Sequence, residues 1–125
     1  MKKILLIEDD RILRENTAEL LELSSYVVIT ASNGRVGIEK AMEVSPDIII
    51  CDIMMPELDG YSVLLELSLD KSTCDIPFVF LSAKTEPKDI FKGIDMGAND
   101  HIKKPFDEST LLSTIARALA KIKEP

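Results

Sequence analysis

Short apolar runs alternate with longer amphipathic segments along the whole chain. The runs typical of β-strands are 3–8, 26–31, 48–52, 77–82 and 99–103. Helices are predicted over 10–23, from the turn at 32–34 to about 44, from the turn at 58–60 to about 69, from 87 to a stop at 97, and from Asp107 to about 122. Regular alternation of strand and helix predicts a parallel sheet that helices cover on both faces. A chain of this length favours a doubly wound open sheet over an eight-stranded barrel.

Local signals fix several of the predicted helix ends. Pro87 suits a first helical turn, Gly97 suits a helix stop, and Asp107 is a candidate N-cap. The apolar face of the first helix is expected to comprise Ile12, Leu13, Ala18, Leu20 and Leu21. On the fourth helix, periodicity places Ile90, Phe91, Ile94 and Met96 mostly in the core, although some of them could instead face a partner.

Composition indicates one soluble globular domain over residues 1–125, with 46% hydrophobic and 30% charged residues. The net charge of −7 argues against direct binding of nucleic acid by this segment, because phosphate contacts need clustered Lys and Arg. The longest apolar runs, 4–7 and 48–51, are too short to cross a bilayer, so we expect a cytoplasmic protein. Cys51 is expected to be a small buried hydrophobe, and Cys74 lies in a polar stretch.

Polar and charged residues follow four of the predicted strands. Glu8 ends the first strand and Asp9 follows it, Asp52 ends the third, Ser82 ends the fourth, and Lys104 follows the fifth. In an open α/β sheet the site lies at the carboxyl ends of the strands, so these side chains should converge. Crowded carboxylates repel, and a hard cation such as Mg²⁺ resolves the repulsion while keeping waters that a phosphate can replace. The ammonium and the hydroxyl suit the oxygens of a transferring phosphoryl group.

Five motifs in this order resemble the receiver domains of two-component response regulators. They are Ile4–Asp10 (ILLIEDD), Asp52–Gly60 (DIMMPELDG), Phe80–Ala83 (FLSA), Gly97–Asp100 (GAND) and Lys104–Phe106 (KPF). Each motif alone is weak, but each lies at the end of its predicted strand and the resemblance runs from Lys3 to about Lys121. The resemblance implies a flavodoxin-like sheet of order 2-1-3-4-5 with five helices.

The resemblance also implies a role for each site residue. Asp52 would be the phosphoacceptor, with Lys104 and Ser82 binding phosphoryl oxygens. Asp9 would bind Mg²⁺ directly, Glu8 would hold one of its waters, and Asp52 and the backbone carbonyl of Met54 would complete the protein ligands.

Two further features follow from the family pattern. His101 would occupy the position of the aromatic switch residue, which moves inward when the Ser82 hydroxyl is drawn to the phosphate. The peptide bond between Lys104 and Pro105 would be cis. Lys103 is expected to be solvated, and Asp10 to start the first helix.

The implied function is that of a phosphoacceptor in two-component signalling. A phosphoryl group would pass from a phosphohistidine of a sensor kinase, or of a phosphotransfer protein, to Asp52 in a Mg²⁺-dependent reaction. Transfer and slow dephosphorylation would be self-catalysed, so the domain is not expected to be an enzyme in the usual sense. The partners would be that kinase, an output domain beyond residue 125, and a second copy bound through the face of the fourth helix, fifth strand and fifth helix.

Three other functions are weighed against this one. A flavin- or nucleotide-binding module needs a Gly- or Ser/Thr-rich loop after a strand, whereas the loop at 8–10 is acidic. A scaffold that has lost phosphorylation would lack the acceptor Asp, an acidic metal residue or the lysine, and all are present. Hydrolysis by paired carboxylates would be a weak activity of the same site. The segment 121–125 suits either a natural terminus or the start of a linker, and the latter is favoured because receivers are most often fused to other domains.

Overall fold

Five parallel strands form one sheet in the order β2-β1-β3-β4-β5. The computed structural model describes residues 1–121. The strands are β1 Lys3–Ile7, β2 Val27–Ala31, β3 Ile48–Asp52, β4 Phe78–Ser82 and β5 Asp100–Lys103. The helices are α1 Arg11–Leu23, α2 Gly34–Val44, α3 Gly60–Ser68, α4 Pro87–Asp95 and α5 Glu108–Lys121. The predicted fold class and all ten elements are confirmed, with ends shifted by one or two residues; Ile122 lies outside the described residues.

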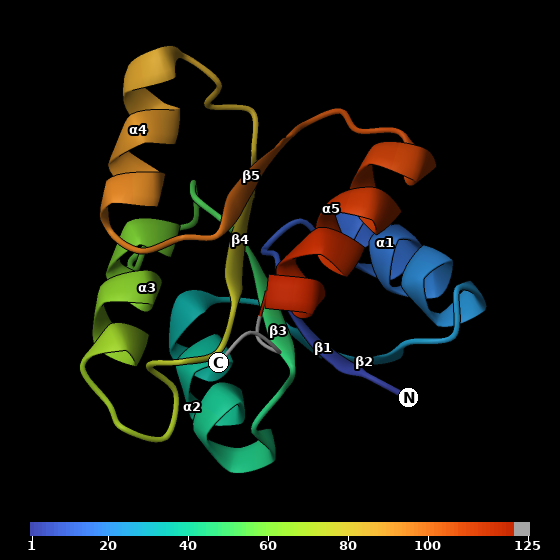
Figure 1. The fold of residues 1–125 in the computed structure, drawn as a ribbon, viewed down its shortest axis with the longest axis horizontal. Coiled ribbons are helices and arrows are strands. Elements are labelled where there is room, and N and C mark those ends of the chain that lie inside the picture. The colour runs from blue at the N-terminus through green and yellow to red at the C-terminus, as the bar shows by residue number, and fades with distance from the viewer. Residues whose placement is uncertain (122–125) are drawn as a thin grey trace.

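The helices cover the two faces of the sheet in separate groups, with α2, α3 and α4 on one side and α1 and α5 on the other (Figure 1). Successive strand residues point to opposite faces, so each strand contributes to both cores. On β1, for example, Leu5 and Ile7 pack in the core below α2–α4, while Ile4 and Leu6 pack in the core below α1 and α5. This double burial explains why β1, β3 and β4 are continuous apolar runs.

Side-chain caps begin four of the helices. The carboxylate or amide oxygens of Asp10, Asn33, Asp59 and Asp107 each accept a hydrogen bond from a backbone N–H in the first turn, at 2.7–3.0 Å. The predicted caps at Asp10 and Asp107 are therefore confirmed. Helix α4 begins with Pro87 instead, and Gly97, just after the helix, has φ +110°, a conformation that glycine adopts without strain.

The expected apolar face of α1 is wrong at one residue. Ile12 is 72% exposed, and the first fully buried positions on this helix are Thr17 and Leu21. Ile12 and Leu21 are about two and a half helical turns apart, so Ile12 lies on the side of α1 opposite the buried Leu21.

The expected burial of α4 is also wrong for most of its apolar residues. Phe91, Ile94 and Ile90 are 75%, 46% and 38% exposed, whereas Met96, just past the helix, packs against the core. Helix α4 lies over the β4–β5 edge of the sheet, and the only buried residue within its bounds is Gly93. An edge helix has a narrow buried stripe, and amphipathic spacing alone does not reveal this.

The exposure of the two cysteines and of Lys103 agrees with the sequence-based expectations. Cys51 is fully buried and Cys74 is exposed, both as free thiols. Lys103 is exposed, as expected. None of the helices within residues 1–121 combines the length and apolarity that crossing a membrane requires.

Candidate functional site

Three carboxylates meet at the carboxyl ends of β1 and β3. These strands are neighbours, with Ile7 paired to Cys51, so the residues that follow lie side by side. Oxygen atoms of Glu8, Asp9 and Asp52 all lie within 4.8 Å of one another. Glu8 and Asp52 are 1% and 6% exposed, whereas Asp9 is exposed. The structure thus brings together the three acidic residues that the sequence placed at one sheet edge.

Lys104 bridges two of these carboxylates. Its Nζ lies 2.6 Å from Oε1 of Glu8 and 3.2 Å from Oδ2 of Asp52, and the lysine side chain is 18% exposed. The backbone holds the residue there, because the Lys104 N–H donates to the carbonyl of Ser82 at 2.9 Å and β5 ends one residue earlier. The peptide bond between Lys104 and Pro105 is cis, as expected.

The electrostatics show how crowded the carboxylates are. Burial, reinforced by the charge of Asp52, raises the pKa of Glu8 from 4.5 to about 7, although the hydrogen bond from Lys104 opposes the rise. Burial alone would lower the pKa of Lys104, but the hydrogen bond to Glu8 and the charge of Asp52 outweigh it and raise that pKa above 10.5. The lysine therefore remains a cation throughout the neutral range.

The residues present fit a hard divalent cation. Glu8, Asp9 and Asp52 offer oxygen ligands only, which is the donor set that Mg²⁺ prefers. When all three are ionised they carry a charge of −3, and Lys104 reduces it to −2, which one divalent ion balances. The Asp9 carboxylate accepts no hydrogen bond from any described residue, so it is available as a ligand.

Ser82 and Lys84 form the start of the loop after β4. Ser82 is fully buried, and its Oγ accepts a hydrogen bond from the backbone N–H of Lys84 at 3.0 Å. Within residues 1–121 the Ser82 hydroxyl proton is donated to no protein acceptor. Ala83 is exposed beside it, so the hydroxyl has room to reorient.

His101 is part of the fold near this loop and not of the acidic cluster. It pairs with Phe80 across β4 and β5, and the two rings are 6.4 Å apart between centroids. Both ring nitrogens are shielded from solvent and have no hydrogen-bond partner among the described residues. Burial lowers the pKa of His101 below its ordinary value of 6.5. The residue as a whole is half-buried, so the cost of desolvation falls on the two ring nitrogens.

The loop after β3 packs closely around the backbone and carboxylate of Asp52. The Met54 N–H lies 3.4 Å from Oδ1 of Asp52, while the Met54 side chain is 63% exposed and Met55 is buried as expected. The Gly60 N–H donates to the carbonyl of Ile53 at 2.8 Å. A Cβ at Gly60 would collide with the carbonyl oxygen of Asp52, so only glycine permits this approach.

Arg14, on the first turn of α1, was not singled out by the sequence. Its guanidinium donates to the carbonyl of Glu8 at 2.8 Å and to that of Asp9 at 3.4 Å. It therefore ties the backbone of the acidic loop to the first turn of α1. Its place on the first turn of the helix after an acidic loop was the available signal, but an arginine there is equally typical of a solvated helix face.

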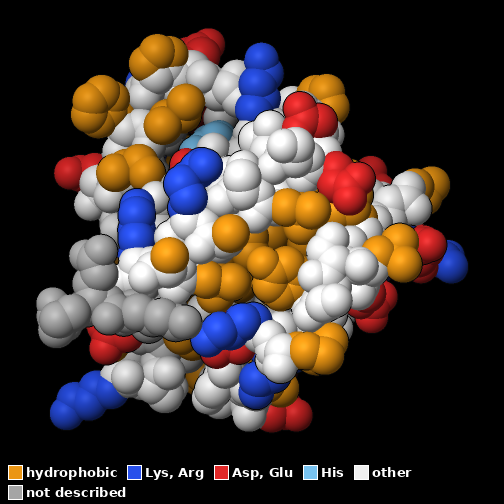
Figure 2. All heavy atoms as spheres, turned by 45° about the vertical axis from the view of Figure 1, so that its right-hand side comes forward, with side chains coloured by type: hydrophobic (Ala, Val, Ile, Leu, Met, Phe, Trp, Pro, Cys, Tyr) orange, Lys and Arg blue, Asp and Glu red, His pale blue; other side chains and the backbone are white. Residues whose placement is uncertain are grey.

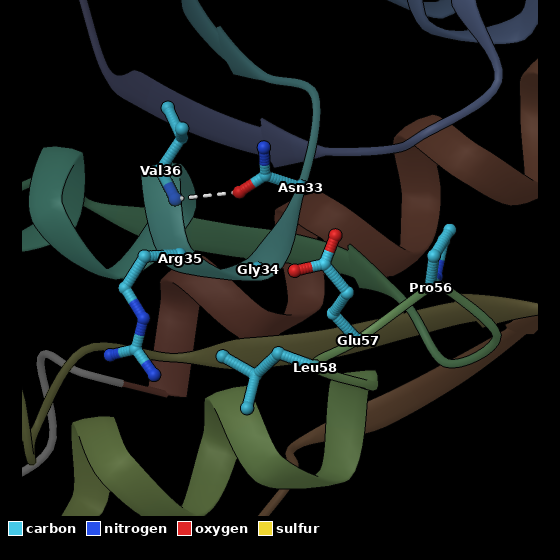
Figure 3. Close-up of a pocket in the computed structure, with 7 residues that line it drawn as sticks. All are labelled: Asn33, Gly34, Arg35, Val36, Pro56, Glu57 and Leu58. Atoms are coloured by element: carbon cyan, nitrogen blue, oxygen red, sulfur yellow. Dashed lines mark hydrogen bonds between the residues drawn. The ribbon is translucent and has the colours of Figure 1, made fainter.

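One of the pockets near the carboxyl edge of the sheet, about 440 Å³, is lined by Ile53, Met54, Met55, Asp59, Tyr61 and Lys84. The pocket in Figure 3, about 370 Å³, is lined by residues 33–36 and 56–58 and includes none of the three clustered carboxylates. Its Arg35 is paired with Glu66 at 3.1 Å.

Another pocket, also about 370 Å³, is mostly apolar and is lined by Leu13, Ala83, Lys104, Pro105 and Phe106. Hydrophobic side chains gather in the middle of the face seen in Figure 2, which brings the α1 and α5 side forward.

Comparison with known proteins points to one family. Residues 4–116 match the family model described as the response regulator receiver domain. The chain is 37% identical over 121 residues to the DNA-binding dual master transcriptional regulator RpaA of Synechocystis sp., covering 97% of this chain and 50% of RpaA. It is 35% identical over 120 residues to protein PilH of Pseudomonas aeruginosa, covering 96% of this chain and 99% of PilH. The chain therefore spans half of one relative and nearly the whole of another.

Solved structures give the same result. The chemotaxis protein CheY4 of Vibrio cholerae superposes with a TM-score of 0.90 at 30% identity, covering 94% of this chain and 98% of CheY4. The non-phosphorylated HemR receiver domain of Leptospira biflexa superposes with a TM-score of 0.88 at 28% identity, covering 100% of this chain and 98% of that one.

Proposed function

The chain belongs to the family of response regulator receiver domains, and from that premise we propose that Asp52 is the residue that accepts the phosphoryl group. The observation that carries this assignment is the setting of the Asp52 carboxylate. It is nearly buried at the end of β3, 3.2 Å from the Lys104 ammonium, and clustered with Glu8 and Asp9. Receivers are signalling domains, so the reaction serves to change a surface and not to turn over a metabolite.

The transfer is an in-line displacement at phosphorus. A carboxylate oxygen of Asp52 forms the new P–O bond while the P–N bond to the donor histidine breaks and its electron pair returns to the imidazole. Lys104 meets the negative charge of the phosphoryl oxygens, and for this it exchanges its contact with Asp52 for one with the phosphoryl group. Ser82 donates its free hydroxyl proton to another oxygen.

We infer that Mg²⁺ is the cofactor, held by Asp9, Asp52 and the Met54 carbonyl, with Glu8 binding through water. The bound ion supplies positive charge that offsets the charge of the phosphoryl oxygens. Within the protein, the task of Glu8 and Asp9 is to fix that charge beside Asp52. The slow loss of the phosphoryl group to water is the hydrolytic activity expected of such a site.

The signal would be read on the face formed by α4, β5 and α5. When Ser82 turns to the phosphoryl group, it leaves space on the inner side of the loop after β4, and the His101 ring gains room to move inward. Ile90, Phe91 and Ile94 expose apolar surface on α4, which suits a partner or a second copy of the chain. Because the chain spans half of RpaA, a C-terminal output domain is a further part of the proposal.

The donor would be a histidine kinase or a phosphotransfer protein. A protein donor must rest on the rim of the site while its phosphohistidine reaches Asp52. The apolar pocket that includes Leu13, Lys104 and Phe106 borders this rim and offers a surface on which the donor protein can dock.

The assignment of Asp52 is tested by incubation with acetyl phosphate and Mg²⁺, followed by intact-mass spectrometry. Wild-type protein should gain one phosphoryl group, and Asp52→Asn should gain none. Asp75→Asn, at an exposed aspartate remote from the cluster, is the matched control and should be labelled like the wild type. Equal labelling of Asp52→Asn and wild type would overturn the assignment.

The metal site is tested by thermal unfolding. Millimolar Mg²⁺ should raise the melting temperature by mass action, because it binds the folded state. Asp9→Ala should remove most of this rise and Glu8→Ala a smaller part. A wild-type melting curve that Mg²⁺ leaves unmoved would contradict the cofactor.

A further inference from the structure

The acidic loop 8–10 carries two of the residues proposed to bind Mg²⁺, Glu8 and Asp9, and their side chains differ in how many hydrogen bonds they accept. The Glu8 carboxylate is fixed by Lys104 at 2.6 Å and by the backbone N–H of Asp10 at 3.2 Å. The Asp9 carboxylate is exposed and accepts no hydrogen bond from residues 1–121. Its position is therefore set by the backbone on which it stands.

Arg14 holds that backbone. Its Nη1 donates to the carbonyl oxygens of Glu8 and Asp9, the two successive peptide groups that carry the acidic side chains. With the carbonyls held on the side of α1, the loop presents the Asp9 carboxylate within 4.8 Å of the carboxylates of Glu8 and Asp52. The 3.2 Å bond from the Asp10 N–H and the Asp10 cap on Leu13 complete the turn into α1.

Lys104 and Arg14 both bring positive charge to the acidic loop, but they donate to different kinds of oxygen atom. Lys104 neutralises the cluster by occupying carboxylate oxygens, which are the atoms that a metal needs. Arg14 brings a permanent positive charge to the same loop, but in the described part of the chain it donates to carbonyl oxygens and not to the carboxylate of Asp9. An arginine at this place can lower the repulsion among the carboxylates without competing for the ion.

We propose that Arg14 is a positioning residue for the metal site, which sets the affinity for Mg²⁺ by fixing the acidic loop. The proposal rests on the proposed function, because it takes Glu8 and Asp9 as the residues that hold the ion. Among residues 1–121, Arg14 forms no hydrogen bond or ion pair with Asp52, so it acts through the loop. Loss of an outer residue that orients metal ligands commonly weakens affinity by about ten- to a hundredfold.

The chain provides a matched control on the same helix turn. Arg11 is also cationic and near the acidic loop, but it is 79% exposed and pairs with Glu15 at 3.0 Å. Arg11→Met and Arg14→Met make the same change in net charge and in side-chain type, and methionine has nearly the same helix propensity as arginine. Only Arg14→Met removes the bonds to the loop carbonyls, so the pair separates positioning from long-range charge.

The experiment is a Mg²⁺ titration of the intact chain, followed through backbone amide shifts of the acidic loop. We expect Arg14→Met to weaken the affinity about tenfold or more, Arg11→Met to change it less than about twofold, and Arg14→Lys to lie between, since an ammonium can meet one carbonyl. In acetyl phosphate labelling, Arg14→Met should need more Mg²⁺ for half-maximal rate, with a smaller loss in the limiting rate.

The two proposals fail in different ways. If the wild type binds Mg²⁺ and Arg14→Met binds it as tightly as Arg11→Met does, the positioning role is refuted and the metal site stands. If the wild type does not bind Mg²⁺, the metal site itself is wrong. If Arg14→Met unfolds too readily to titrate, Arg14→Lys decides, and wild-type affinity in that variant together with a lowered metal-free melting temperature would show a purely structural role.

Discussion

In the metal-free protein, the contribution of Glu8 to the free energy of unfolding should fall as pH rises from 4.5 to about 7. Its carboxyl is 1% exposed and faces Asp52, and these conditions raise its pKa from 4.5 to about 7. Substitution to Gln keeps the shape of the side chain and an oxygen that can accept from Lys104 and from the Asp10 N–H. The substitution removes the ionisation, and with it the ionic part of the contact with Lys104.

The sign follows from proton linkage. A group whose pKa is higher in the folded than in the unfolded state stabilises the fold fully below its unfolded pKa of 4.5, and this contribution is lost as pH rises to about 7. At about 1.4 kcal/mol for each pH unit, the loss between these limits is about 3 kcal/mol. The Glu8→Gln variant should therefore gain about 3 kcal/mol of stability relative to the wild type between pH 4.5 and 8.

The measurement is denaturant unfolding of both proteins in a chelator, across this pH range. Taking the difference between them cancels the titration of all other groups that the substitution leaves unchanged. Glu15→Gln, at an exposed carboxylate on α1, is the control and should differ from wild type by less than about 0.5 kcal/mol at every pH. Millimolar Mg²⁺ should shrink the Glu8 effect, because a cation stabilises the ionised form. A stability difference that stays flat with pH, or that falls as pH rises, would refute the reasoning.

Three further predictions can be checked by denaturant unfolding. Because burial lowers the pKa of His101, the folded state resists protonation, so the contribution of His101 to stability should fall as pH drops below 6.5, and the stability of His101→Phe relative to wild type should rise over the same range. Gly60→Ala should cost about 1–3 kcal/mol, because its Cβ would collide with the Asp52 carbonyl; an unchanged midpoint would show that the loop relaxes freely. Leu21→Ala should cost about 2–5 kcal/mol at a fully buried site, whereas Ile12→Ala, on the same helix but 72% exposed, should cost less than about 0.5 kcal/mol.

The sheet could be predicted from the sequence because its signals are local. Strands buried on both faces are continuous apolar runs, and caps such as Asp10 and Asp107 mark helix starts through bonds that span only three residues. Exposure on α4 could not be predicted in this way. Phe91 and Ile94 have the spacing of a core-facing stripe, but how much of a helix is covered depends on the position of the helix over the sheet, and α4 lies at an edge.

The meeting of Glu8, Asp9, Asp52 and Lys104 was predictable because parallel strands share one carboxyl edge. That rule places side chains that follow strands, but it says nothing of a residue that acts from a helix on backbone atoms. Arg14 bonds to carbonyl oxygens, which every residue has, so no pattern of side chains announces the contact. The role of Arg14 becomes visible only when the hydrogen bonds of the two acidic side chains are compared. The Glu8 carboxylate has two partners, and the Asp9 carboxylate has none within the described chain. The Asp9 carboxylate is the most exposed of the three, so in our proposal its position is set through the backbone, and the group that fixes this backbone lies on the first turn of α1.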